Sequence, residues 1–211
     1  MSDRMSAAAN AVSAEEALEI ATREHEKAAR NLAPDARVLF GLWGAAWGIG
    51  FAALWLTDGD EPRIDLPTVG WIVFGVSMIG ALVGTGIHIG RRVHGVHGRS
   101  AVMGRRYSAA WVIAFAAYGA LMSALGATDA SDEVLNLLSP LLACLIVGLM
   151  YMAAGALWED SVQFLLGAWI TVVVGIAAIV GVPNHLLVMS VLGGGGFLIG
   201  ALMARWRSAH T

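Results

Sequence analysis

Six long apolar stretches alternate with short polar segments along the chain. Each stretch holds about 20 residues, the length of helix that crosses a hydrocarbon layer of roughly 30 Å. The pattern predicts an all-α, polytopic integral membrane protein with six transmembrane helices, built as one membrane domain over residues 37–207. The predicted spans cover residues 38–56, 68–90, 107–126, 140–158, 162–182 and 186–204.

The segment before the spans, residues 1–36, follows a different pattern. Ser13 and Glu16 have the spacing of a capping box, and a narrow, alanine-rich face recurs after them at helical intervals. Pro34 ends the pattern, because the residue before a proline avoids helical geometry. We predict an amphipathic cytoplasmic helix over about residues 13–32 that adheres weakly to the membrane or docks under the bundle. No uninterrupted apolar run occurs before Pro34, so we expect no cleavable signal peptide.

The basic residues predict an orientation for the bundle. Of the 13 Lys and Arg, 12 lie before the first span, at its start, between the second and third spans or after the sixth, and Arg63 alone lies in the other set of loops. Cytoplasmic loops of membrane proteins carry the excess of Lys and Arg. We therefore predict a multi-pass protein of the plasma membrane with both termini in the cytoplasm.

Small residues at four-residue spacing predict the faces on which spans contact one another. Lipid tails give helices no hydrophobic reason to associate, so membrane bundles rely on small residues that let backbones approach closely. The candidates are Gly44, Gly48 and Ala52 in the first span, Gly80 and Gly84 in the second, and Gly196, Gly200 and Ala204 in the sixth.

Aromatic side chains form stripes at the same spacing in the first and third spans. Such a stripe is typical of a packing ridge or a lipid-facing ridge, and the alternative is that it lines a ligand cavity. The residues that would line such a cavity are Trp43, Trp47, Phe51, Trp111 and Phe115.

Four consecutive glycines lie inside the sixth span, at Gly193, Gly194, Gly195 and Gly196. Each glycine in a helix interior costs about 1 kcal/mol relative to alanine, so the run indicates a need for bare backbone. Either another helix presses against it, or the helix opens and exposes backbone groups to a buried site. Close packing is the commoner explanation.

Ionisable side chains are scarce in the apolar stretches. No Asp, Glu, Lys or Arg falls inside a predicted span, which removes the usual ligands for proton or sodium coupling. His88, near the inner end of the second span, is the one titratable candidate. It either relays a proton or binds an anionic headgroup, or it simply forms a hydrogen bond at the interface.

The connection after His88 is rich in arginine and histidine. Basic clusters beside a span attract anionic lipid, although topology alone also explains arginines at this place. Two histidines three residues apart could share a metal, but the cationic surroundings and the lack of a carboxylate predict no metal site. The further headgroup candidates are Arg91, Arg92, His94, His97 and Arg99.

The composition excludes several other classes of protein. The chain is 57% hydrophobic and 14% charged, with a mean hydropathy of +0.68, beyond what a soluble domain normally carries. The net charge of −3 gives no support to nucleic-acid binding. Cys144 is the only cysteine, so no disulfide can form within the chain. Lys27, the only lysine, lies outside the spans and cannot hold retinal, and no second membrane histidine faces His88 to ligate haem. No phosphate loop, zinc motif or nucleophile elbow is present, so we predict neither enzymatic activity nor a cofactor.

Four runs carry a resemblance to known proteins. LWGAAWGIGF at 42–51, TGIHIGRR at 85–92, LGAW at 166–169 and the glycines at 193–196 resemble a group of uncharacterised actinobacterial six-span membrane proteins. The likeness covers most of the chain, and such proteins are loosely labelled transmembrane transport proteins. The resemblance implies a bacterial inner-membrane protein, but no substrate, mechanism or site residue.

Three functions follow as hypotheses. The leading one is a translocator of a small molecule or ion, or the membrane subunit of one. The rival is a non-transporting accessory or scaffold subunit that binds anionic lipid, a partner membrane protein or a second copy of itself. The third is the substrate-binding subunit of a vitamin-uptake complex, which fits the size and number of spans. A polar or aromatic-lined cavity at the midplane would favour transport, whereas a solid bundle would favour assembly.

Overall fold

The computed structural model describes residues 16–20, 35–57, 62–92 and 99–209. These residues form helices and no strand, and six helices are long and apolar enough to cross a membrane. The all-α, six-span fold class is therefore confirmed. Residues 16–20 are helical, as predicted for the N-terminal segment. The remainder of that predicted helix lies outside the described residues.

The sixth span differs from the others because it contains a π-helical segment between two α-helices. It consists of α8 (Asn184–Val188), η1 (Met189–Gly194) and α9 (Gly195–Ala209). The other spans are α3 (Ala36–Thr57), α4 (Pro67–Arg92), α5 (Arg99–Gly126), α6 (Asp132–Leu157) and α7 (Ser161–Val180).

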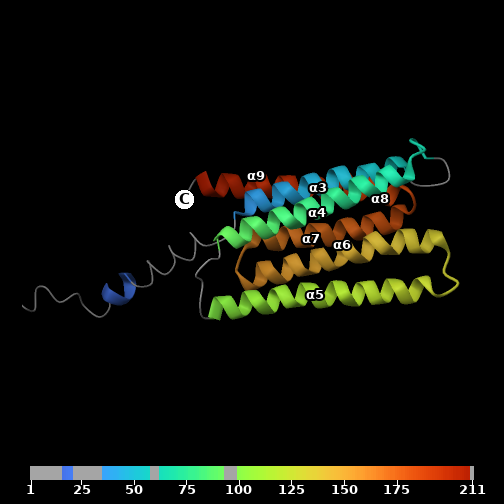
Figure 1. Cartoon of the computed structure of the whole chain (residues 1–211). Coiled ribbons are helices and arrows are strands. Elements are labelled where there is room, and N and C mark those ends of the chain that lie inside the picture. The colour runs from blue at the N-terminus through green and yellow to red at the C-terminus, as the bar shows by residue number, and fades with distance from the viewer. Residues whose placement is uncertain (1–15, 21–34, 58–61, 93–98, 210–211) are drawn as a thin grey trace, which may run out of the picture.

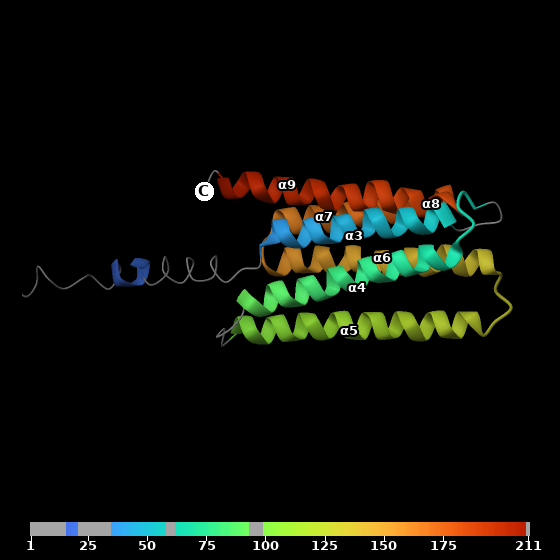
Figure 2. The same ribbon diagram turned by 45° about the horizontal axis from the view of Figure 1, so that its top comes forward.

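The helices run up and down beside one another (Figures 1 and 2). The α3 helix packs on η1 and α9, and α7 packs on α6 and on all three parts of the sixth span. The α4 helix rests mainly on α3, and α5 rests on α6. The core of the protein therefore lies among α3, α6, α7 and the sixth span, with α4 and α5 on its flanks.

The fourth span begins earlier than the sequence predicts. In the sequence, Ser139 and Pro140 have the pattern of a cap and a first-turn proline, whereas in the structure Pro140 lies inside α6 and the helix begins at Asp132. The side chain of Ser131 caps this start by accepting a hydrogen bond from the backbone of Val134 at 3.4 Å. Asp132 and Glu133 then occupy the first turn, where the helix dipole favours negative charge. The predicted start at residue 140 is therefore wrong, because a good cap upstream outweighs a proline that a membrane helix tolerates.

The third span also begins before its predicted start at residue 107. The α5 helix starts at Arg99 and includes Arg105 and Arg106 in its first turns. Hydropathy marks only where the apolar stretch begins, and a helix continues past that point into the headgroup region. In the turn before α7, the carboxylate of Asp160 caps that helix by accepting hydrogen bonds from the backbone N–H groups of Val162 and Gln163 at 3.0 and 3.3 Å.

Aromatic side chains fill the middle of the bundle. Trp47, near the centre of α3, meets Phe197 of α9 edge-on, with ring centroids 5.1 Å apart. Phe197 in turn meets Tyr151 of α6 at 5.5 Å. Trp47 and Phe197 are almost wholly buried. The level that would lie at the membrane midplane is therefore closed by packed rings.

Small residues let the backbones of α3 and the sixth span approach each other closely. A Cβ atom added at Gly194 would lie 2.8 Å from the backbone nitrogen of Gly48 and 3.1 Å from the carbonyl oxygen of Gly44. In α4 only one of the two predicted contact glycines, Gly80 and Gly84, lies against another helix. Gly84 lies against Leu42, whereas a Cβ at Gly80 would meet nothing within 4 Å.

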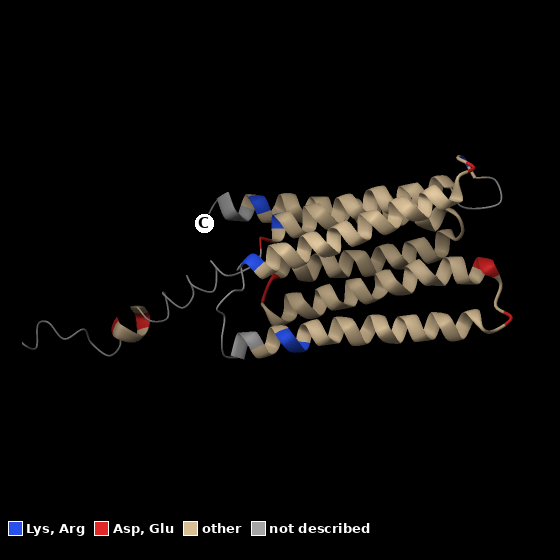
Figure 3. Ribbon diagram, viewed as in Figure 1, with Lys and Arg blue, Asp and Glu red and all other residues tan. Residues whose placement is uncertain are grey.

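The charged residues that the structure describes separate toward the two ends of the bundle (Figure 3). We call one the arginine-rich end; it carries Arg37, Arg91, Arg105, Arg106 and Arg205. Arg63 lies at the opposite end, with its guanidinium 3.8 Å from the ring centroid of Trp55. Arg63 therefore makes a cation–π contact at the end opposite the arginine-rich end.

Candidate functional site

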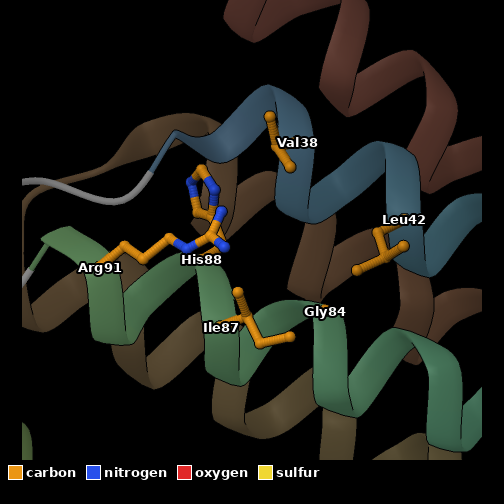
Figure 4. Close-up of a pocket in the computed structure, with 6 residues that line it drawn as sticks. All are labelled: Val38, Leu42, Gly84, Ile87, His88 and Arg91. Atoms are coloured by element: carbon orange, nitrogen blue, oxygen red, sulfur yellow. The ribbon is translucent and has the colours of Figure 1, made fainter.

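A groove between α3 and α4 opens at the arginine-rich end (Figure 4). Its volume is about 420 Å³. Aliphatic side chains from both helices form its walls, and two nitrogen-bearing side chains of α4 lie toward its outer end. The lining residues are Val38, Leu42, Gly84, Ile87, His88 and Arg91.

The groove owes its shape to one glycine and one hydrogen bond. A Cβ at Gly84 would lie 2.6 Å from a methyl carbon of Leu42, so a larger residue at this position would displace the leucine side chain from its place against α4. One residue further on, Thr85 accepts a hydrogen bond from the indole Nε1 of Trp43 at 3.0 Å. These contacts hold the two helices together along the floor of the groove.

His88 joins the end of α4 to the beginning of α3. The backbone N–H of Asp35 donates to its Nε2 at 3.0 Å. Since Nε2 accepts this bond, the proton of the neutral ring lies on Nδ1. The structure thus shows that His88 forms a hydrogen bond at the helix end, which is one of the roles predicted for it. The Nδ1–H group of the same ring is a further hydrogen-bond donor.

The charges around His88 leave a positive groove mouth. Arg37 binds the carboxylate of Asp35 in a two-pronged ion pair, with the shortest N–O distance at 2.6 Å. This pair largely cancels its own charges. Arg91 is exposed and forms no ion pair with any carboxylate among the described residues. Its guanidinium extends toward His88 (Figure 4).

The length of α4 places this mouth at the level of lipid headgroups. Trp71, which is 60% exposed, lies near the other end of the helix. Trp71 and Arg91 are 20 residues apart, which corresponds to about 30 Å of helix and matches the thickness of a hydrocarbon layer. Exposed tryptophans prefer the membrane interface, so Arg91 and His88 reach the interface on the other side.

A second groove of about 490 Å³ lies at the same end, between α6 and α7. It has a different character, because its polar groups include a carboxylate. The lining residues are Gly155, Ala156, Glu159, Ser161, Phe164 and Leu165.

The aromatic candidates line neither groove. Trp47 and Phe51 are 2% exposed and belong to the core, so this part of the stripe is a packing ridge. Trp43 is partly buried against α4. Trp111 and Phe115 stack on each other along α5, with planes 11° apart and centroids 5.9 Å apart. The structure does not bring the two stripes together into a ligand cavity lined by these rings.

The glycine run agrees mainly with the close-packing alternative, although the helix that carries it changes geometry. Gly193 packs on the ring of Trp47, Gly194 on the backbone of α3 and Gly196 on Trp169, while a Cβ at Gly195 would meet nothing within 4 Å. The helix is not broken, but it widens to a π-helix that ends at Gly194. The indole of Trp169 donates a 2.9 Å hydrogen bond to the carbonyl of Leu192 in this segment. Packing therefore explains three of the four glycines.

The structure describes only part of the predicted basic cluster. Arg92 and Arg99 lie at the end of α4 and the beginning of α5, and their side chains are outside the described set. His94 and His97 lie outside the described residues altogether. Within the described ranges, no three His, Cys, Asp or Glu residues gather closely enough to hold a metal ion.

A completely buried histidine lies at the beginning of the sixth span. His185 is 0% exposed at the beginning of α8. Its backbone N–H donates to the carbonyl of Gly181 at 2.7 Å. The missed signal is helical spacing, because His185, Met189, Gly193 and Phe197 recur every four residues and all are buried.

Comparison with known proteins adds no relative to this picture. No protein-family model, curated protein or solved structure matches the chain. The site is therefore interpreted from its own residues.

Proposed function

We propose that this integral membrane protein is a non-transporting module, an accessory or scaffold subunit that holds lipid or a partner protein at its arginine-rich end. The protein lies in the plasma membrane with that end in the cytoplasm. The packed midplane is the single observation that carries the proposal.

A pathway for a solute needs polar groups or space at the midplane. Trp47 and Phe197 occupy this level, and Phe51 extends the packing toward Phe74 of α4 with ring centroids 5.3 Å apart. The described helices carry no Asp, Glu, Lys or Arg there, and both grooves lie near the arginine-rich end. These features support a static bundle rather than a conduit.

The distribution of arginine supports the orientation. Arginines of α3, α4, α5 and α9 gather at one end, in agreement with the excess of basic residues that cytoplasmic loops carry (Figure 3). Arg63 lies at the other end and packs on Trp55, and the described arginines of the arginine-rich end are more numerous.

A translocator is the second candidate, and the π-helical segment favours it. Single π-helical turns inside α-helices occur frequently at functional sites. The segment at Met189–Gly194 lies in the sixth span beside the buried His185. If η1 returned to α-helical geometry, the packing of α9 against α3 would have to change. The resemblance to proteins labelled as transporters agrees with this candidate.

Flux into proteoliposomes distinguishes the two candidates. The full chain is reconstituted, and uptake of protons, sodium, a neutral sugar, an amino acid and a small aromatic solute is compared with uptake by protein-free vesicles. We expect no flux above the protein-free rate for any solute. A solute that enters only vesicles containing the protein would replace this proposal with the second candidate.

A further inference from the structure

We propose that the groove between α3 and α4 binds one anionic phospholipid of the cytoplasmic leaflet. The phosphate lies between Arg91 and His88, and an acyl chain lies along the aliphatic walls. This inference deepens the proposed function, because it names the partner held at the arginine-rich end, and it rests on the orientation proposed above.

The aliphatic walls suit an acyl chain. Val38 and Ile87 are 47% and 50% exposed, so the groove is open to the surrounding lipid. Gly84 lies seven residues before Arg91 in α4, which places the inner end of the groove roughly 10 Å deeper in the membrane. The groove thus descends from the headgroup level into the hydrocarbon region, as a lipid does.

The outer end of the groove suits a phosphate. Arg91 provides a planar guanidinium, whose several N–H groups match phosphate oxygens. The Nδ1–H of His88 is a second donor, because Nε2 is occupied by the backbone N–H of Asp35. The carboxylate of Asp35 would repel a phosphate, but Arg37 holds it at 2.6 Å and offsets its charge.

The groove between α6 and α7 provides an internal comparison. It has a similar volume and lies at the same end, yet Glu159 lines it. A carboxylate in that position disfavours a phosphate. The preference for anionic lipid should therefore belong to the α3–α4 groove, and not to the arginine-rich end as a whole.

Native mass spectrometry of the full chain in mild detergent tests the site. The protein is mixed with phosphatidylglycerol or with phosphatidylcholine of the same acyl chains, and the lipid that remains bound is counted. We expect the wild type to retain phosphatidylglycerol preferentially. Arg91→Gln should lower its affinity about fivefold, the value of one basic residue near an anionic headgroup. Ile87→Trp, which fills the groove, should lower the affinity for both lipids.

Two matched variants control for diffuse effects. Arg205→Gln removes an arginine from the same end, and Val76→Trp adds an indole to an exposed position of α4. Neither residue lines the groove, and we expect both variants to bind lipid as the wild type does. Circular dichroism and size-exclusion chromatography establish that each variant is folded. Should Ile87→Trp fail this check, the pair of arginine variants decides the question.

Three results would overturn the proposal. One is equal retention of the two lipids by the wild type. Another is an equal effect of Arg91→Gln and Arg205→Gln, which would indicate diffuse attraction. The last is full displacement of the lipid by glycerol phosphate, which would indicate a site for a soluble phosphate. Each result leaves the flux measurement unaffected, so failure of the lipid site is distinguishable from failure of the proposed function.

Discussion

The hydroxyl group of Ser190 donates a 2.7 Å hydrogen bond to the backbone carbonyl of Gly48, across 142 residues of sequence. Ser190 lies in the π-helical segment, and Gly48 lies near the centre of α3. The bond joins the irregular part of the sixth span to the close glycine contact between these helices.

We predict that Ser190→Ala lowers the free energy of unfolding by about 1 kcal/mol, the usual size of an interhelical hydrogen bond in a membrane protein. Unfolding is measured by titration from mild detergent into sodium dodecyl sulfate. Ser123→Ala on the exposed face of α5 is the control and should change stability little. Equal effects of the two substitutions would refute the role of this bond.

Alanine substitutions at two adjacent glycines, Gly194 and Gly195, should change the free energy of unfolding by different amounts. At Gly194 the new Cβ would press on backbone atoms of Gly48, which cannot move aside as a side chain can, so we expect Gly194→Ala to cost about 2 kcal/mol. At Gly195 the Cβ meets nothing within 4 Å, so Gly195→Ala should be neutral or slightly stabilising. The same unfolding titration measures both. A destabilisation at Gly195 that matches the one at Gly194 would show that the glycine run does not serve packing.

The number of spans follows from the sequence, because a stretch of about twenty apolar residues is most simply a membrane-spanning helix. The sequence predicts a start at residue 140 because Ser139 and Pro140 have the pattern of a cap and a first-turn proline. Ser131, followed by Asp132 and Glu133, is a second helix start in the same polar segment, and it is the one that the structure uses. Helix capping depends only on neighbouring residues, so the start of α6 at Asp132 is predictable from the sequence.

The groove could not be predicted in the same way. His88 and Arg91 are visible as polar residues at a span end, but Val38 and Leu42 become their neighbours only through the pairing of α3 with α4. The burial of Trp47 likewise depends on which helix faces it, because a stripe of four-residue spacing packs equally well on protein or lipid. The sequence shows that the aromatic stripe exists, but it does not show which helix packs against the stripe.

Removal of the His88 side chain should loosen the beginning of α3. His88→Ala deletes the acceptor of the Asp35 N–H, and we expect hydrogen exchange of that amide to accelerate several-fold, in line with a net hydrogen bond of about 1 kcal/mol. His88→Gln offers a side-chain oxygen in a similar position and should restore part of the protection. Arg91→Gln should leave this exchange unchanged, which separates anchoring of α3 from lipid binding. Unaltered exchange in His88→Ala would contradict the anchoring role.

Cysteine labelling in intact cells tests the central claim, that the described bundle lies in the membrane with its arginine-rich end inside. Cys144 is 3% exposed, so the wild type should not react with a membrane-impermeant maleimide. Asp129→Cys lies at the opposite end of the bundle and Ser161→Cys at the arginine-rich end. We expect Asp129→Cys to be labelled in intact cells and Ser161→Cys to be labelled only after permeabilisation. Labelling of Ser161→Cys in intact cells, with Asp129→Cys protected, would contradict it.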